Sequence, residues 1–492
     1  MELDVIGGSY HHKYLDVNPQ TTVNWYPVDK TKRESNKTLH SLFPTPGLVE
    51  FADSSAKFIR GMVVAKTLNK NRCFFVADDI LYELGKDSTI TNRGALPNAV
   101  GATTPVYFST NSNNEIAIID RGSTCEFMNG YLFVTNNGSI TGSIFDMDTD
   151  TLTAITDVDF PNTSADIGYV SWSAANDFTS WTGADTFAAA FKADPATRIL
   201  AWRDELYVFG TSVIEMYYND GTTFVKSERA TVHLGQIAPH SAVVFYNGLY
   251  FVGTTEAGQA AIYQIGNDYQ VQQVSPFSVS EQIGKNITLE DVEGYLQYSQ
   301  DGHTFYYVHI PSIDTTYVFD TLNNEFHERK STKPYSNVDG SKDQGMFRGR
   351  FYINWDGLRL YGDRYSGKIL KEDYNTYTED GEVIIRERTT TIYTQEYKWL
   401  SVEKLEIDCN TGFGATTGQG SDPHLMFSIS TDGGITFKNE VCVALGKLGR
   451  YDHRTRLWGI GTSPQWAFKF RISDPVSCVI IGATATGQIG TD

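Results

Sequence analysis

The sequence predicts an all-β protein built from short antiparallel strands joined by tight turns, and three observations carry this prediction. The 492 residues include 28 tyrosines, 28 phenylalanines and 43 glycines, a composition that suits pleated sheets and the turns between them. From Ile199 to Tyr218 three apolar runs alternate with polar breaks, which indicates three strands of a meander. A turn followed by Leu-Tyr or Phe-Tyr also recurs along the chain, at Leu81-Tyr82, Leu206-Tyr207, Leu249-Tyr250, Phe305-Tyr306 and Phe351-Tyr352.

The spacing of this repeated unit favours a β-propeller over residues 51–375. The steps from Tyr207 to Tyr250 and from Tyr306 to Tyr352 fall in the range of about 40 to 50 residues that one propeller blade occupies. The repeat is degenerate, and spacing alone is also compatible with a β-sandwich. We therefore expect a propeller and keep the sandwich as the alternative for this region.

Residues 1–50 are expected to form an ordered arm that packs its aromatic side chains on the first propeller sheet. Pro27, Pro44 and Pro46 interrupt the apolar clusters of this segment. Proline and the residue before it disfavour helix and favour extended or turn backbone.

Hairpins are expected from Phe58 onwards. The turn signals with the strongest local chemistry are Asn129-Gly130, Asn137-Gly138 and Asn247-Gly248, because asparagine and glycine tolerate the positive φ of two-residue hairpin turns. Trp355-Asp356-Gly357 is a further turn. Two short stretches, residues 187–193 and 278–283, are candidates for helical connectors.

A polar stretch at residues 374–381 is the best domain boundary. Beyond it the blade-like unit no longer recurs, and residues 376–492 are predicted to form a β-sandwich of roughly 115 residues. Residues 382–393 are rich in β-branched side chains and indicate one long strand. Further strand candidates include residues 425–429 and 467–472.

The charge and cysteine content limit the classes of function. A formal net charge of -19 argues against a general nucleic-acid binding surface, because affinity for the phosphate backbone rests on Lys and Arg. The five cysteines are widely scattered without a C-x-x-C pair, which favours reduced thiols over a zinc site or a disulfide framework; they are Cys73, Cys125, Cys409, Cys442 and Cys478. No signal sequence and no run of about 18 apolar residues is evident, so we expect a soluble product with no membrane partner.

Asp146, Asp148 and Asp150 have the alternate spacing of a calcium-binding loop. The sixth position of such a loop is normally glycine and the twelfth a bidentate glutamate, whereas this chain has Thr151 and Asp157 there. A solvated hairpin tip is therefore the favoured interpretation, and weak calcium binding is the alternative.

No catalytic, cofactor-binding or metal-ligating residues are predicted. His11, His12 and His40 are candidate metal ligands, but adjacent side chains of a strand point to opposite faces, so surface histidines are favoured. The phosphate-loop, zinc-protease and nucleophile-elbow motifs do not occur in the sequence. Acidic residues are too numerous to nominate one pair as acid and base.

Several short motifs, in order along most of the chain, resemble the packaged-DNA stabilisation proteins of short-tailed bacteriophages. The opening part has an N-x-Y-P element at residues 24–27 and a P-x-P-G-L element at residues 44–48. The middle and closing parts contribute Ser173, Asp177, Trp181, Phe187, Ala190, Asp194, Ile199, Trp202, residues 206–210, Ile214-Glu215, residues 219–221, residues 430–437, Leu445-Gly446, Gly449, Tyr451, Arg454, Arg456, Trp458, Gly461 and residues 468–473.

The resemblance implies a structural, non-enzymatic tail hub or stopper. It implies a propeller of about seven blades followed by a sandwich, and about six subunits in a ring around the tail axis. The ring would lie below the portal and its adaptor and above the tail needle, next to the tailspikes. It would let double-stranded DNA pass without sequence-specific contact, and it would be assembled in the host cytoplasm. The acidic balance agrees with DNA that passes without sticking.

A glycan-binding or sialidase-like propeller is the alternative function. Residues 430–437 resemble the S-x-D-x-G-x-T-[WF] box of sialidases, which in those enzymes is a structural turn, and Asp432 and Gly433 favour a structural turn here too. An enzyme of that class requires arginines clustered for a sugar carboxylate and an acid of perturbed pKa, all converging at one mouth of the propeller.

Overall fold

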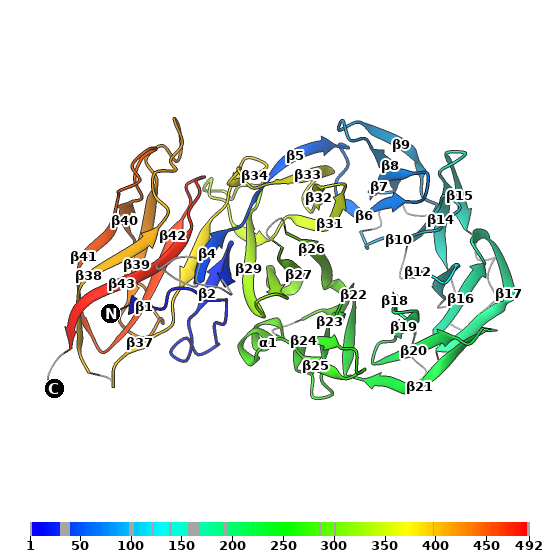
Figure 1. Cartoon of the computed structure of the whole chain (residues 1–492), viewed down its shortest axis with the longest axis horizontal. Coiled ribbons are helices and arrows are strands. Elements are labelled where there is room, and N and C mark those ends of the chain that lie inside the picture. Colours follow the sequence, from blue (N-terminus) through cyan, green and yellow to red (C-terminus); the bar gives the residue numbers. More distant parts are fainter. Residues whose placement is uncertain are drawn as a thin grey trace.

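The computed structural model describes residues 2–29, 40–97, 103–120, 123–136, 140–155, 168–189, 195–221, 223–284, 287–299, 302–396 and 398–489. Figure 1 shows a ring of small sheets joined on one side to a β-sandwich. The predicted fold class, an all-β propeller followed by a sandwich, is confirmed. Strands greatly outnumber helices, because β-branched and aromatic residues alternate with turn residues along most of the chain.

In the described part of the chain, seven blades of four strands surround the propeller axis. In ring order they are β6 (Ile59–Lys66), β7 (Asn71–Ala77), β8 (Ile80–Leu84) and β9 (Ile90–Ala95); β10 (Tyr107–Thr110), β11 (Glu115–Asp120), β14 (Thr141–Asp146) and β15 (Thr151–Ile155); β12 (Cys125–Met128), β13 (Tyr131–Asn136), β16 (Gly168–Ala174) and β17 (Asp177–Ala189); β18 (Arg198–Trp202), β19 (Glu205–Phe209), β20 (Val213–Asn219) and β21 (Phe224–His233); β22 (Gln236–Phe245), β23 (Gly248–Thr254), β24 (Ala260–Ile265) and β25 (Val271–Gln273); β26 (Glu293–Tyr298), β27 (Thr304–Ile310), β28 (Thr315–Asp320) and β29 (Glu325–Thr332); β31 (Gly349–Trp355), β32 (Leu358–Asp363), β33 (Lys368–Asp373) and β5 (Gly47–Asp53).

The turn chemistry explains how the chain reverses within the blades. Asn129 and Gly130 have φ values of 53° and 90°, and Asp356 and Gly357 have φ values of 49° and 90°. These are the positive angles that a type I′ hairpin turn requires, and the turns join β12 to β13 and β31 to β32. Both predicted hairpins are confirmed, whereas Asn137-Gly138 lies outside the described residues.

The second and third blades are interleaved in the sequence. The chain forms β10 and β11, crosses to the next blade for β12 and β13, and returns for β14 and β15. It then adds β16 and β17 to the third blade. β11 therefore pairs with β14, with Ala117 opposite Ile144, although a whole hairpin of the neighbouring blade lies between them in the chain. The second blade is therefore completed only after the first hairpin of the third blade has been passed in the chain.

The seventh blade takes its outer strand from the opposite end of the chain. β5 pairs antiparallel with β33, with Leu48 opposite Glu372 and Glu50 opposite Leu370. β34 (Thr378–Glu379) and β35 (Glu382–Val383) extend this sheet beyond β5. The ring is thus closed by main-chain hydrogen bonds between its first and last segments.

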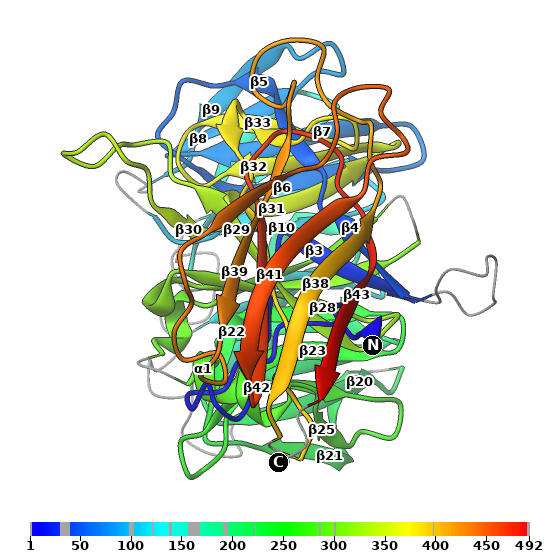
Figure 2. The same cartoon turned by 90° about the vertical axis from the view of Figure 1, so that its left-hand side faces the viewer.

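Two sheets form the sandwich (Figure 2). The first sheet has the order β3, β4, β43, β38, β41, with β1 at β43, and the second has the order β2, β36, β42, β39, β40, with β37 at β42. The strands are β1 (Glu2–Leu3), β2 (Thr21–Val23), β3 (Trp25–Asp29), β4 (His40–Pro44), β36 (Arg386–Thr389), β37 (Tyr393–Thr394), β38 (Leu400–Cys409), β39 (His424–Ser430), β40 (Val441–Ala444), β41 (Thr455–Ser463), β42 (Gln465–Ile472) and β43 (Ile480–Ile489).

The second sandwich sheet continues into the sixth blade. β2 pairs parallel with β29, where Val23 faces Glu328, and antiparallel with β36, where Thr22 faces Arg388. Asn24 follows directly and adopts φ 56°. Its buried side chain donates hydrogen bonds to the carbonyls of Lys330 and Ile385, at 2.8 and 2.7 Å. One short strand therefore holds the two domains in a single hydrogen-bonded sheet.

The first 50 residues are shared between the two domains. Ser9 and Tyr10 contact β29 of the propeller, where the Ser9 amide donates to the carbonyl of Phe326. β1, β3 and β4 lie in the first sandwich sheet, and the Trp25 indole is fully buried in the sandwich core. The Trp25 Nε1 donates to the carbonyl of Cys478 at 2.9 Å.

Two local predictions are wrong. Residues 382–393 do not form one long strand but three short ones, β35, β36 and β37, because the segment passes from the propeller sheet to the sandwich sheet. Phe187 lies near the end of the long strand β17 and not in a helix. Its ring stacks on Tyr217 of the next blade, which favours the extended backbone at this position. Residues 190–193 lie outside the described residues. The other connector is helical, as α1 (Phe277–Ile283).

The remaining elements are short. β30 (Gln344–Met346) pairs with β29, and two single 3-10 turns occupy Leu289–Asp291 and Pro311–Ile313. In the part of the chain that the structure describes, no helix has the length and apolar character needed to cross a bilayer.

Trp25→Ala is expected to destabilise the protein by about 3–5 kcal/mol, because it opens a large cavity in the sandwich core and leaves the Cys478 carbonyl without its donor. The free energy of unfolding in urea measures this loss. Trp399→Ala is the matched control, because Trp399 is 51% exposed and its removal should cost less than about 1 kcal/mol. Equal losses for the two variants would contradict the proposed anchoring of the N-terminal segment.

Candidate functional site

Two hollows of the molecule are lined by both titratable and aromatic side chains and are candidates for functional sites. One is a cavity of about 500 Å³ on the propeller axis, and the other is a cleft of about 810 Å³ at one end of the sandwich. The seven innermost strands, labelled around the centre of the ring in Figure 1, all contribute to the axial cavity or to its rim.

The innermost strands place polar side chains together because they begin at the same mouth of the propeller. Tyr107 and Arg198 are the first residues of β10 and β18, and Glu293 is the first residue of β26. Glu126 and Arg350 are the second residues of β12 and β31. Adjacent innermost strands lie side by side around the axis, so these five side chains line one cavity.

One half of the cavity holds an ion-pair network of Arg350, Arg364 and Glu293. Arg350 Nε lies 3.1 and 3.0 Å from the two carboxylate oxygens of Glu293, and Arg364 Nη2 lies 3.4 Å from Glu293 Oε2. Burial by itself would raise the pKa of Glu293, but the two guanidinium charges outweigh it and hold that pKa at about 2. Glu293 is therefore ionised throughout the physiological range.

The other half holds an arginine without a hydrogen-bonding partner. The Arg198 Nε and Nη1 atoms are buried and have no hydrogen-bond partner among the described residues. The guanidinium carbon instead lies 4.0 Å from the centroid of the Tyr107 ring. A cation over an aromatic face is stabilised by the ring quadrupole, but the N–H groups still lack acceptors.

Burial controls the protonation of the two groups beside Arg198. It raises the pKa of Glu126 to about 7, and the attraction of Arg198 offsets this only in part. Burial also lowers the pKa of His240 to about 4, with Arg198 adding to the effect. The neutral His240 ring shares a short hydrogen bond with the Tyr107 hydroxyl. The cavity thus combines an unpaired cation, a neutral imidazole and a carboxyl that titrates near neutrality.

Clustered arginines and a carboxyl group of perturbed pKa are what the glycan-processing alternative requires. None of these residues was predicted from the sequence as a site residue. Arg198, Arg350, Glu126 and Glu293 belong to four different blades and share no local motif. The available signal was a charged residue at the start of a strand whose other residues are apolar, as in β18.

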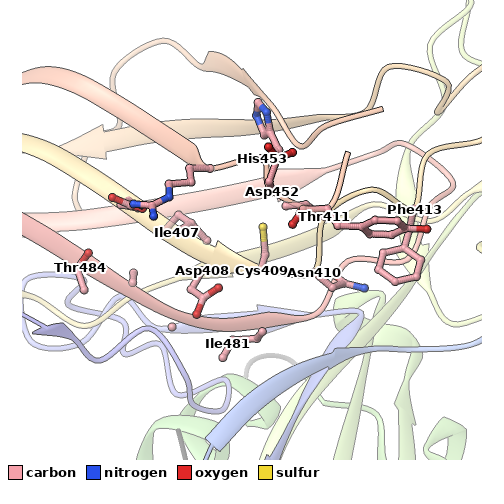
Figure 3. Close-up of a pocket in the computed structure, with 15 residues that line it drawn as sticks. Ile407, Asp408, Cys409, Asn410, Thr411, Phe413, Asp452, His453, Ile481 and Thr484 are labelled. Atoms are coloured by element: carbon pink, nitrogen blue, oxygen red, sulfur yellow. The ribbon is translucent and has the colours of Figure 1, made fainter. Parts of the chain in front are cut away.

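The sandwich cleft lies between the end of β38, the start of β43 and the loop of residues 451–454 (Figure 3). The Cys409 and Asp408 side chains point to opposite sides of β38 in this view, as strand geometry requires. The Cys409 Sγ lies 3.8 Å from Thr455 Oγ1, and burial raises the pKa of this thiol to about 11. His453 Nε2 lies 2.8 Å from the Ala444 carbonyl. A protonated, buried thiol is not a nucleophile, so the cleft does not present a Cys-His pair for catalysis.

The rim of the cleft is aromatic and exposed. Phe413 is 51% and Tyr451 68% exposed, and their ring centroids are 6.0 Å apart at 72°. Beside them Glu406 accepts a hydrogen bond from Arg456 Nε at 3.0 Å, which lowers the pKa of the Glu406 carboxyl. Exposed aromatic rings beside partly buried charges are typical of surfaces that bind other proteins.

Exposed apolar side chains are concentrated on the sandwich. Of the eighteen large hydrophobic side chains that are exposed among the described residues, eight lie in residues 399–489. These eight are Trp399, Phe413, Ile435, Val441, Leu448, Tyr451, Trp458 and Ile489. A fifth of the chain therefore carries nearly half of these side chains.

The three aspartates with calcium-like spacing lie at the tip of the β14–β15 hairpin. Asp148 lies 3.1 Å from Lys70 Nζ, and Asp150 lies 2.7 Å from Arg72 Nη2. Asp146 accepts the amide of Asp148 at 2.8 Å and so closes the turn. Asp157 lies outside the described residues, and no group of three possible metal-ligating side chains occurs in the ranges that the structure describes.

The histidines and the sialidase-like box have structural surroundings. His11 Nδ1 is 3.7 Å from Glu328 and His12 Nε2 is 3.5 Å from Glu281, while His40 is exposed on β4, so the structure does not bring the three together. Asp432 accepts hydrogen bonds from Ser430 Oγ and the Thr436 amide within its own turn, at 2.6 and 2.9 Å. The five cysteines are free thiols, of which only Cys442 is exposed.

Two family models match the chain and together cover most of it. The model described as "Bacteriophage P22 Gp10, beta-propeller" matches residues 1–377, and the model described as "Bacteriophage P22 Gp10, beta-sandwich" matches residues 385–488. No curated protein matches the chain.

The solved structures that match the chain are distant from it. The extracellular domain of the hybrid two component system BT4673 from B. thetaiotaomicron is 9% identical with a TM-score of 0.37; the match covers 84% of this chain and 47% of that one, so this chain spans less than half of it. An exo-beta-1,3-galactanase from Phanerochaete chrysosporium is 8% identical with a TM-score of 0.30, over 89% and 99% of the two chains. A gluconolactonase from Xanthomonas campestris is 10% identical with a TM-score of 0.34, over 72% and 97%.

Glu126→Gln is expected to change how stability depends on pH. Because burial raises the Glu126 pKa to about 7, the folded protein retains a proton that the unfolded chain has already lost, so the contribution of Glu126 is full below about pH 4.5 and falls as pH rises through 7. The stability of the variant relative to wild type should rise by up to about 2 kcal/mol between pH 5 and 8. Urea unfolding at each pH measures this difference, and parallel pH profiles for the two proteins would contradict the raised pKa.

Proposed function

This chain belongs to the bacteriophage P22 Gp10 family and has a structural role in a phage tail, and we propose that it is the hub or stopper that closes the DNA exit channel. In this proposal the protein docks below the portal and its adaptor, retains the packaged genome, and connects to the tail needle and the tailspikes. About six copies form a closed ring around the tail axis. Assembly takes place in the host cytoplasm.

The closed propeller supports this proposal because a stopper acts by shape. The ring of blades is completed by hydrogen bonds between β5 and β33, and β2 extends the sixth blade into the sandwich. Load on one domain is then transmitted to the other through main-chain hydrogen bonds and packed side chains rather than through a linker. A body of this kind resists internal DNA pressure with no bond chemistry.

The observation that carries the proposal is the concentration of exposed apolar side chains on the sandwich. Trp458 and Ile489 lie on the first sheet, and Phe413 and Tyr451 surround the cleft. Aromatic side chains are enriched in the centres of protein interfaces, where they supply most of the binding energy. We therefore assign the sandwich to docking with a neighbouring subunit or the adaptor.

The acidic charge supports a channel through which DNA passes without adhering. A formal charge of -19 on each chain becomes larger still in a ring of copies. Phosphates are repelled by such a surface, so the DNA has no attractive sites to hold it.

We keep a three-part division of the chain within this proposal. Residues 1–50 are the arm, residues 51–375 the propeller and residues 376–492 the sandwich. The arm supplies β2 and the first four residues of β5, so in functional terms it fastens the other two parts together.

Trp458→Asp is expected to weaken assembly with purified portal and adaptor by at least about tenfold, because a carboxylate in the apolar part of an interface loses its hydration without gaining a partner. Negative-stain imaging and analytical ultracentrifugation measure the fraction of rings formed. Tyr246→Asp is the matched control, since Tyr246 is 76% exposed and belongs to the propeller, in the turn between β22 and β23. Unchanged ring formation by the Trp458 variant would remove the sandwich from the interface.

Genome retention tests the function itself. Phage particles assembled without this protein should release their DNA within the first steps of purification, because no other part of the proposed plug closes the channel. Nuclease sensitivity of the packaged DNA measures the loss. Particles that lack the protein yet keep their DNA protected would refute the stopper function while leaving the fold unaffected.

A further inference from the structure

The axial cavity of the propeller has no role in the docking function proposed above, yet its polar groups are incompletely satisfied. The Arg198 side chain forms no hydrogen bond with any described residue, and two of its nitrogens are buried. Two other buried arginines each have a carboxylate partner: Arg348 forms a bidentate pair with Asp363 at 3.0 and 2.9 Å, and Arg329 Nη2 lies 3.0 Å from Glu379. Arg386, which also has two buried nitrogens without partners among the described residues, donates to the Val476 carbonyl at 3.3 Å. Burying a guanidinium without hydrogen-bond acceptors costs free energy, so a ligand that supplies acceptors to Arg198 would be stabilised there.

The charge balance inside the cavity favours an anionic partner. Glu293 is shared between Arg350 and Arg364 and leaves one positive charge in excess. Arg198 adds a second, and Glu126 removes at most one. Glu290 and Asp291 line the outer mouth, but they are exposed to solvent, where screening weakens their repulsion.

The size and lining of the cavity favour a ring-sized ligand over a bare inorganic anion. Its volume of about 500 Å³ lies within the usual range of small-molecule sites, about 300–1,000 Å³. Aromatic side chains contribute to the wall, among them Phe108, Tyr295 and Tyr352. Glu126 and His240 supply further hydrogen-bonding groups for hydroxyls beside Arg198.

We propose that the axial cavity binds an acidic sugar, a sugar ring that carries a carboxylate, with Arg198 receiving the carboxylate and Glu126 and His240 facing the ring hydroxyls. The guanidinium fork of Arg198 matches a planar carboxylate in a bidentate pair. The aromatic wall packs against the apolar faces of the ring. The site binds without catalysis, and it does not depend on the role of the protein in the tail.

Isothermal titration calorimetry on the full-length protein at pH 6.5 tests this site with four probes. Glucuronic acid and N-acetylneuraminic acid are the acidic sugars, glucose is the neutral sugar and sodium phosphate is the inorganic anion. We expect at least one acidic sugar to bind, and to bind at least about tenfold more tightly than glucose or phosphate. Phosphate binding as tight as that of the sugars would overturn the sugar assignment, and no binding of either acidic sugar would overturn the site.

Variants of Arg198 provide the second part of the test. Arg198→Met should lower the affinity for the acidic sugar by at least about tenfold, and Arg198→Lys, which keeps the charge but not the fork, should fall between wild type and Arg198→Met. Arg203→Met is the control, because Arg203 lies exposed in the turn after the same strand and contacts Trp202 instead of the cavity. Unfolding midpoints verify that each variant is folded. Equal affinities for wild type and the Arg198 variants would overturn the assignment of Arg198.

Discussion

The structure depends on one continuous hydrogen-bonded sheet that runs from the sixth blade through β2 into the sandwich. β2 contributes only residues 21–23, yet it pairs with β29 on one side and β36 on the other. Asn24 then uses its side chain amide to bind carbonyls of both domains. Because buried main-chain groups must be paired, the two domains cannot separate without exposing these donors and acceptors. Main-chain pairing through β2 and the hydrogen bonds of Asn24 therefore contribute to the relative position of propeller and sandwich.

Buried arginines reinforce the same junction. Arg388 of β36 is fully buried, and its guanidinium donates to the carbonyls of Val5 and Gly8, both at 2.8 Å, and to Gln20 Oε1 at 2.8 Å. Arg348 of the seventh blade binds Asp363 and the Glu379 carbonyl. Burying a charge is less costly when the charged group is hydrogen-bonded, so Arg388 holds the N-terminal segment against β36, and Arg348 holds β34 against the seventh blade.

The sandwich cleft and the axial cavity differ in polarity, and this difference suits the cleft to binding proteins and the cavity to binding small molecules. The sandwich cleft is surrounded by exposed rings, and its titratable groups are engaged with neighbouring residues. The axial cavity has the opposite character, with a charged interior and an arginine that lacks acceptors. A large exposed apolar surface gains free energy by association, whereas an unpaired buried charge gains it from a complementary ion.

The sequence alone determined the all-β class and the individual hairpins at Asn129-Gly130 and Asp356-Gly357, because turn geometry and strand alternation are local properties of the chain. The tertiary structure decided which strands share a blade. The interleaving of β10–β17 and the division of residues 382–393 between two sheets depend on pairing across long stretches of chain, which no local pattern encodes. The axial site could also not be predicted from the sequence. Arg198, Glu126 and Glu293 are unremarkable singly and become a site only because strands from separate blades begin at one mouth of the ring.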